Sequence, residues 1–187
     1  MSLKNLVLIL LFFSGIWVAN AQDTFTPPKH NFSFGPMAGY NLDTKGLAYG
    51  GGLMYEYRPF QKFGFTTALM YERTRKDVSG DYWGELDGTH VYGDVRIHQE
   101  YSLNVGARYY MGGFYLATAL GVGYDDYYTN LSDGSISDGG HAYGLYKSLG
   151  AGYQIPLKNR DVIEAEAGFF GTRDMKIGGT VRYKIRR

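Results

Sequence analysis

The stretch from Glu100 to Tyr124 alternates between two kinds of residue on either side of a Gly pair at 112–113. A period of two residues predicts β-strands, and the short Gly break predicts a hairpin between them. One phase is large and mostly apolar: Tyr101, Leu103, Val105, Ala107 and Tyr109, then Phe114, Leu116, Thr118, Leu120, Val122 and Tyr124. The other phase is small or polar: Glu100, Ser102, Asn104, Gly106 and Arg108, then Tyr115, Ala117, Ala119, Gly121 and Gly123.

The same alternation recurs along the chain and predicts an all-β fold. The expected strands are 31–41, 47–58, 63–75, 92–110, 113–125, 141–155, 161–171 and 175–185. Tight connections at 58–62, 111–112 and 156–160 alternate with two long polar ones at 76–91 and 126–140 and two short ones near 43–45 and 172–174. Short turns at one rim and longer loops at the other are typical of an eight-stranded antiparallel up-and-down transmembrane β-barrel. A ten-stranded barrel would need a further hairpin within 76–91.

The size of the residues in the small phase indicates which face meets lipid. Ala117, Ala119, Gly121 and Gly123 are poor strand formers for a water-exposed face, but they suit the crowded interior of a narrow barrel. The large phase is therefore predicted to face lipid, although a soluble barrel with the opposite orientation is the alternative. The residues expected on the lipid face are Leu103, Val105, Leu116, Leu120, Val122, Phe169 and Val181.

Charged residues fall in the phase assigned to the interior. The expected lumen charge network consists of Glu56, Glu72, Glu100, Arg108, Glu164, Glu166, Arg182 and Lys184. Folding the last hairpin about Arg173 places Glu164 opposite Arg182, as pairing of buried charges would require. Because eight strands enclose a space that side chains can fill, we expect a plugged lumen. A narrow pore for water, ions or small solutes is the alternative.

The N-terminal segment has the pattern of a cleaved secretory signal. Lys4 is the one charge before Asp23, residues 6–13 are apolar, and Ala19-Asn20-Ala21 has the small-x-small form of a cleavage site. We therefore expect a signal peptide at 1–21, an extended lead-in at 22–30 and a barrel domain at 31–187. The alternative is an N-terminal helical anchor.

Composition excludes several classes of function. Without 1–21, 18 Lys and Arg balance 18 Asp and Glu, so the chain has no basic footprint for nucleic acid. The absence of Cys excludes disulfides and thiol chemistry.

Over about 31–187 the sequence resembles the small outer-membrane β-barrel proteins of Gram-negative envelopes. The resemblance is carried by NFSFGPMAGYN, NVGARYYMGGFYLATALGVGY and KIGGTVRYKI. It implies residence in the outer membrane after export, with outer-membrane lipids, lipopolysaccharide and the barrel-assembly machinery as partners. An extracellular ligand could bind the loops at 76–91 and 126–140. Family members often end on an aromatic residue used in assembly, for which Tyr183 is the nearest candidate here.

The sequence predicts no catalytic residues, no cofactor and no metal site. No His has the His-x-Ser spacing of one class of related membrane hydrolases. Asp125, Asp126 and His141 flank one long loop and could activate water, but we interpret them as a solvated rim. Asp133 and Asp138 lack the spacing of a calcium loop and are expected to form turns. The predicted role is structural or interaction-based, with a pore as the alternative and a hydrolase as the least favoured.

Overall fold

The structure is a computed structural model that describes residues 28–86 and 89–186. The expected signal peptide at 1–21 and most of the lead-in lie outside the described residues. The strands are β1 (His30–Asn41), β2 (Gly46–Tyr57), β3 (Phe63–Asp77), β4 (Tyr82–Leu86), β5 (Thr89–Met111), β6 (Phe114–Leu131), β7 (Ile136–Pro156), β8 (Val162–Gly171) and β9 (Lys176–Arg186). Nowhere in this part of the chain is there a helix with the length and hydropathy needed to span a membrane.

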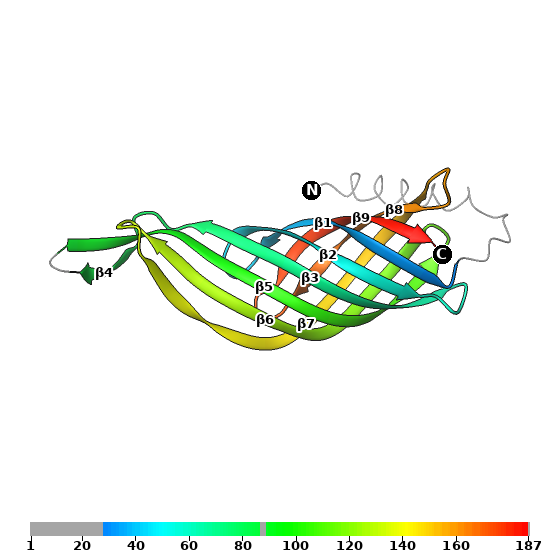
Figure 1. Cartoon of the computed structure of the whole chain (residues 1–187), viewed down its shortest axis with the longest axis horizontal. Coiled ribbons are helices and arrows are strands. Elements are labelled where there is room, and N and C mark those ends of the chain that lie inside the picture. Colours follow the sequence, from blue (N-terminus) through cyan, green and yellow to red (C-terminus); the bar gives the residue numbers. More distant parts are fainter. Residues whose placement is uncertain (1–27, 87–88, 187) are drawn as a thin grey trace, which may run out of the picture.

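Eight of the strands close into a ring. They follow the order β3-β2-β1-β9-β8-β7-β6-β5, and β5 pairs back onto β3 (Figure 1). All of these pairs are antiparallel. The predicted eight-stranded antiparallel barrel is thus confirmed. Among the described strands, β4 pairs with β5 alone and lies outside the ring, so the hairpin at 76–91 does not enlarge the barrel to ten strands.

The strands of the ring are staggered. Register partners lead once round the ring from Asn41 through Lys176, Phe170, Ser148, Ala119, Gly106, Thr66 and Glu56 to Asn31. One circuit therefore returns to β1 ten residues earlier, at Asn31 instead of Asn41. Such a stagger tilts the strands by roughly 35–45° to the barrel axis and sets the width of the lumen.

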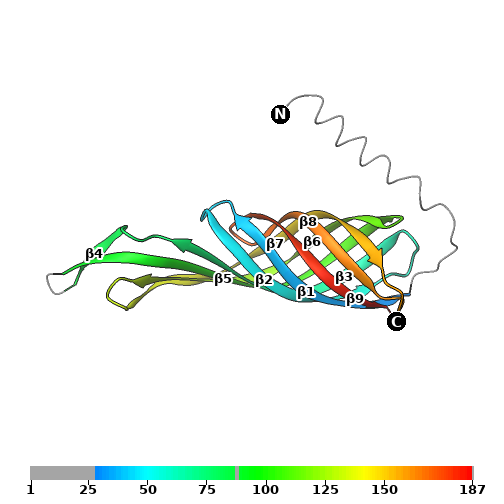
Figure 2. The same cartoon turned by 90° about the horizontal axis from the view of Figure 1, so that it is seen from above.

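The regions 76–91 and 126–140, which we expected to be long loops, are largely strand. Strands β5 and β6 stay paired well past the ring, up to Gly93 and Leu131. The two hairpins, here called the outer blade (residues 76–96 and 127–140), project from the end opposite the C-terminus (Figures 1 and 2). Ser132 N donates to Tyr92 O at 2.9 Å and ties the two hairpins together. The expectation failed because these two regions are rich in Asp, Gly and Ser, which are depleted in strands and typical of turns.

The distribution of side chains is the inverse of that in a soluble protein. The seven residues expected to face lipid point outward and are 47–62% exposed. The largest fully buried side chains include Arg108, Lys176, Lys184, Glu56 and Glu164. Charged residues are almost never fully buried unless they are paired, so a polar interior combined with an apolar exterior indicates a wall that faces hydrocarbon.

Aromatic residues form belts at both ends of the apolar wall. Tyr71, Tyr101, Tyr124 and Tyr143 are successive register partners on β3, β5, β6 and β7. At the opposite end the rings of Phe63 and Tyr109 lie 5.0 Å apart, and those of Phe34 and Tyr183 lie 5.9 Å apart. Between the belts runs an aliphatic row of Leu53, Leu69, Leu103, Val122 and Leu145. Aromatic belts at both ends of an apolar wall are typical of the two interfaces of a bilayer.

Val105 and Ile136 provide a matched test of whether the apolar wall faces lipid. Val105 lies midway between Tyr101 and Tyr109 and is 62% exposed, whereas Ile136 lies on the blade and is 66% exposed. We expect Val105→Arg to lower the free energy of unfolding by about 2–4 kcal/mol in lipid vesicles, because Arg would lie near the bilayer midplane. Ile136→Arg should change it by less than about 0.5 kcal/mol. Equal effects of the two substitutions in urea titrations would contradict the assignment of the wall.

Candidate functional site in the barrel interior

A cluster of six charged side chains fills the lumen near the tight-turn end. This basal cluster comprises Glu56, Arg108, Glu164, Glu166, Arg182 and Lys184, whose three acids balance three bases. Arg108 Nη1 donates to both Glu164 carboxylate oxygens at 3.1 Å, and its Nη2 donates to Glu166 at 3.0 Å. Lys184 donates to Glu164 at 3.0 Å and also to Glu56. The cluster therefore joins β2 and β5 to β8 and β9 through the interior.

Glu164 and Arg182 are register partners, yet their main contacts lie elsewhere. Arg182 Nε is 3.6 Å from Glu164 Oε2, while Arg182 Nη2 donates to Glu166. Glu164 instead accepts from Arg108 on β5 and, at 2.7 Å, from Gln154. Strand register thus identifies neighbours on adjacent strands of the wall. Long side chains in a narrow barrel can also pair across the lumen, as Arg108 and Glu164 do.

Two buried tyrosines complete the basal cluster. Tyr110 donates to Glu56 at 2.5 Å, and Tyr115 donates to Glu166 at 2.9 Å. A Cβ at Gly152 would lie 2.4 Å from the Tyr115 ring, so the absence of a side chain there makes room for this aromatic residue. Tyr115 belongs to the phase that the alternation assigned to the interior, whereas Tyr110, two residues after Arg108, was not predicted to lie in the lumen.

Towards the blade, a second group of charges forms the outer cluster, defined as Glu72, Glu100, Lys176, His98, Asp125 and Asp174. Lys176 is fully buried and donates to Glu100 at 2.5 Å and to Glu72. Thr172 Oγ1 also donates to Glu100, at 2.5 Å. Glu72 and Glu100 are predicted lumen residues, and Lys176 shares their inward face.

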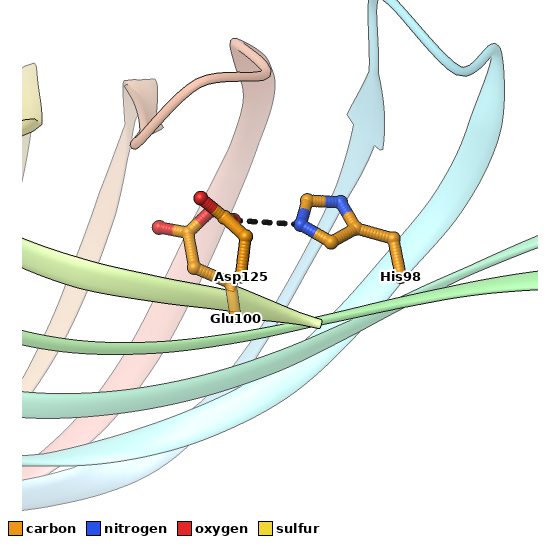
Figure 3. Close-up of side chains that lie close together, drawn as sticks. All are labelled: His98, Glu100 and Asp125. Carbon is orange, nitrogen blue, oxygen red and sulfur yellow. Dashed lines mark hydrogen bonds and ion pairs between the residues drawn. The ribbon is translucent and has the colours of Figure 1, made fainter. Parts of the chain in front are cut away.

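His98 and Asp125 lie at the outer end of this cluster. They come from the adjacent strands β5 and β6, and Figure 3 shows their side chains converging with that of Glu100. His98 Nε2 is hydrogen-bonded to Asp125 Oδ1 at 2.7 Å. Asp125 is fully buried, so our interpretation of this residue as solvated rim is wrong. Asp126 and His141 are register partners, while Asp133 and Asp138 accept backbone bonds from Ser135 and Gly140, as expected for turns.

An apolar layer separates the two clusters. Met37, Tyr146 and Phe170 are buried there and pack against Met70. A cavity of about 50 Å³ lies in this layer and is lined in part by Ala117, Ala119 and Gly150. It has room for only a few water molecules. The interior therefore consists of a balanced ionic layer, a small gap and a second, more acidic ionic layer.

Comparison with known proteins identifies the architecture. No family model matches the sequence, and no curated protein matches it. Among solved structures, Ail, the attachment invasion locus protein of Yersinia pestis, superposes with a TM-score of 0.54 at 18% identity, covering 86% of this chain and 100% of Ail. Ail in complex with the heparin analogue sucrose octasulfate gives 0.53 at 19% identity with the same coverage. A major outer membrane protein of Thermus thermophilus gives 0.50 at 13% identity, covering 83% of this chain and 99% of that protein.

The fold is that of a small outer-membrane β-barrel. In an outer-membrane barrel of this size the interior is filled by side chains. The basal cluster and the outer cluster occupy that interior here.

A double-mutant cycle tests whether the basal cluster is a coupled unit. Glu164→Gln should lower the free energy of unfolding by about 3–5 kcal/mol, because it leaves Arg108 with less compensation in a buried site. Combined with Arg108→Met, the total loss should be well below the sum of the single losses. The control pairs Glu164→Gln with Lys176→Met, whose sites lie in different clusters, and these effects should add. Additivity in both cycles, measured by urea unfolding in vesicles, would contradict the network.

Proposed function

We propose that this chain is an integral outer-membrane protein with a structural or interaction role, whose lumen is plugged by paired charges. The observation that carries the proposal is the basal cluster. Arg108 of β5 reaches Glu164 and Glu166 of β8, and Lys184 of β9 reaches Glu56 of β2. Each charge therefore has an opposite charge within the lumen, and an ion entering it would have to displace one of these partners.

The orientation in the membrane follows from the two ends of the barrel. Short turns lie on the periplasmic side of outer-membrane barrels and longer loops lie outside. The described chain begins and ends at the tight-turn end, as an exported chain with the expected signal peptide would. The aromatic belts and the apolar wall between them then contact outer-membrane lipids and lipopolysaccharide. Assembly through the barrel-assembly machinery is part of this proposal.

The outer blade supplies the contact surface for an interaction role. Tyr82 and Tyr92 are 60% and 40% exposed, with rings 6.2 Å apart, and Trp83 is 39% exposed. Exposed aromatic residues of this kind are enriched at protein interfaces. The blade also carries Asp77, Asp81, Asp94, Asp133 and Asp138. This acidic character favours an aromatic contact over recognition of a sulfated ligand such as the one bound by Ail.

Conductance in planar bilayers tests the plug directly. We expect the wild-type protein to insert without steady conductance, because the basal cluster closes the lumen. A variant with Glu56, Arg108, Glu164 and Lys184 all changed to Ala removes two acids and two bases, and it should open steady channels. Tyr82→Ala on the blade is the control and should stay closed. Steady wild-type conductance would favour the alternative, a narrow pore for water, ions or small solutes.

Fractionation and gel mobility test the location. We expect the protein to fractionate with the outer membrane and to migrate faster on gels unheated than boiled, because the closed barrel resists detergent. Recovery as a detergent-free periplasmic monomer would contradict the proposed membrane residence.

A further inference from the structure

The outer cluster contains more acidic groups than basic ones. Glu72, Glu100 and Asp125 are all at most 3% exposed, and Asp174 lies beside them at 17% side-chain exposure. Within the described residues, Lys176 is the permanently charged base that the salt bridges of this cluster contain. Burying uncompensated carboxylates is unfavourable, so this end of the lumen has a deficit of positive charge. The basal cluster has no such deficit.

Several polar atoms in the same place also lack partners. In the described part of the chain, Asp125 Oδ2, His98 Nδ1 and Glu72 Oε2 are buried and accept or donate no hydrogen bond. Such atoms are rare in native proteins and call for a specific explanation, such as a bound ion. A His converges here with two carboxylates, so a cation at this place would have to accept nitrogen as well as oxygen ligands.

We propose that His98, Glu100 and Asp125 bind a divalent transition-metal ion of the Zn²⁺ type at the blade end of the lumen. Each residue offers one ligand atom, and these atoms all lie within 4.8 Å of one another. His and carboxylate ligands in a set of three, with a further position for water, suit Zn²⁺. Mg²⁺ and Ca²⁺ prefer oxygen ligands alone and are disfavoured by the imidazole.

The surroundings of His98 already orient it as a ligand. Its ring stacks on Tyr127 with centroids 4.2 Å apart and an interplanar angle of 8°. Asp174 Oδ2 lies 3.6 Å from Nδ1 and itself accepts from Asn41 at 3.2 Å. A hydrogen bond from Nδ1–H to a carboxylate would fix the tautomer in which Nε2 is free to bind the metal, and Asp174 is placed to accept that bond once His98 moves onto the ion.

Binding requires the three ligand atoms, which lie within 4.8 Å of one another, to close around the ion. Two ligand atoms about 2.1 Å from a tetrahedral Zn²⁺ are roughly 3.4 Å apart, so the 2.7 Å bond from His98 Nε2 to Asp125 Oδ1 must be replaced by two metal bonds. A neutral ring must move its single proton from Nε2 to Nδ1, where the resulting Nδ1–H faces Asp174, so that the Nε2 lone pair is free for the ion.

Titration of the folded, untagged protein in detergent with Zn²⁺ and Co²⁺ tests the site. We expect one Zn²⁺ per chain by calorimetry and a visible absorption band for Co²⁺ that Zn²⁺ abolishes. His98→Gln and Asp125→Asn should each weaken binding by at least about tenfold, and Asp174→Asn by about tenfold through the orientation of His98. His141→Gln, which removes an exposed His, is the matched control and should bind as the wild type does.

Two outcomes would overturn the proposal. One is a wild-type protein that binds neither ion at neutral pH, and the other is binding that survives in both His98→Gln and Asp125→Asn. Each variant is first checked by the gel shift between unheated and boiled samples, so that loss of binding is read only from a folded barrel. Asp125→Asn preserves side-chain size and keeps the test available if His98→Gln does not fold.

Discussion

The narrowness of a closed eight-strand ring is the constraint on which the other features of this structure depend. A stagger of ten residues sets the width, and the side chains that point inward must then fit together without bulk water. Charges held in such a space are stable only in hydrogen-bonded pairs. The basal cluster meets this requirement by balancing Arg108, Arg182 and Lys184 against three glutamates. Small residues on neighbouring positions, such as Gly152 beside Tyr115, provide the remaining room.

The two ends of this narrow lumen differ in charge balance and therefore in their tendency to bind an ion. The basal cluster has equal numbers of acids and bases, so its charges compensate one another and leave no excess charge to attract an ion. The outer cluster has more acidic than basic groups and contains buried polar atoms without hydrogen-bond partners, and both features favour a bound cation. The apolar layer around Met37, Tyr146 and Phe170 lies between them. The proposed closure of the lumen and the proposed ion binding therefore rest on separate residues and can be tested by separate mutations.

The sequence predicted the barrel because alternation with a period of two separates, on each strand, the residues that face lipid from those that face the lumen. It predicted the inward phase of Glu56, Glu100 and Arg108 for the same reason. It placed Glu164 opposite Arg182, and the two are register partners with Arg182 Nε 3.6 Å from Glu164 Oε2. It did not predict the contact between Glu164 and Arg108, because alternation gives neighbours on adjacent strands and says nothing about contacts across the lumen. It also missed the pairing of His98 with Asp125, since the polar Asp125-Asp126 pair was taken to be the start of a loop. Beyond the ring the sequence is rich in Asp, Gly and Ser, which favour turns, so the paired strands of the blade were taken for loops.

Strand β5 links all of these features in one continuous element. It begins in the blade, contributes His98 and Glu100 to the outer cluster, and ends beyond Arg108 in the basal cluster. Because it pairs with β6 over almost its whole length, it cannot shift at one end without breaking the register at the other. The blade is thus held by the same ladder that closes the barrel. The ladder therefore sets the position of Tyr92, and β4 places Tyr82 opposite it as its register partner.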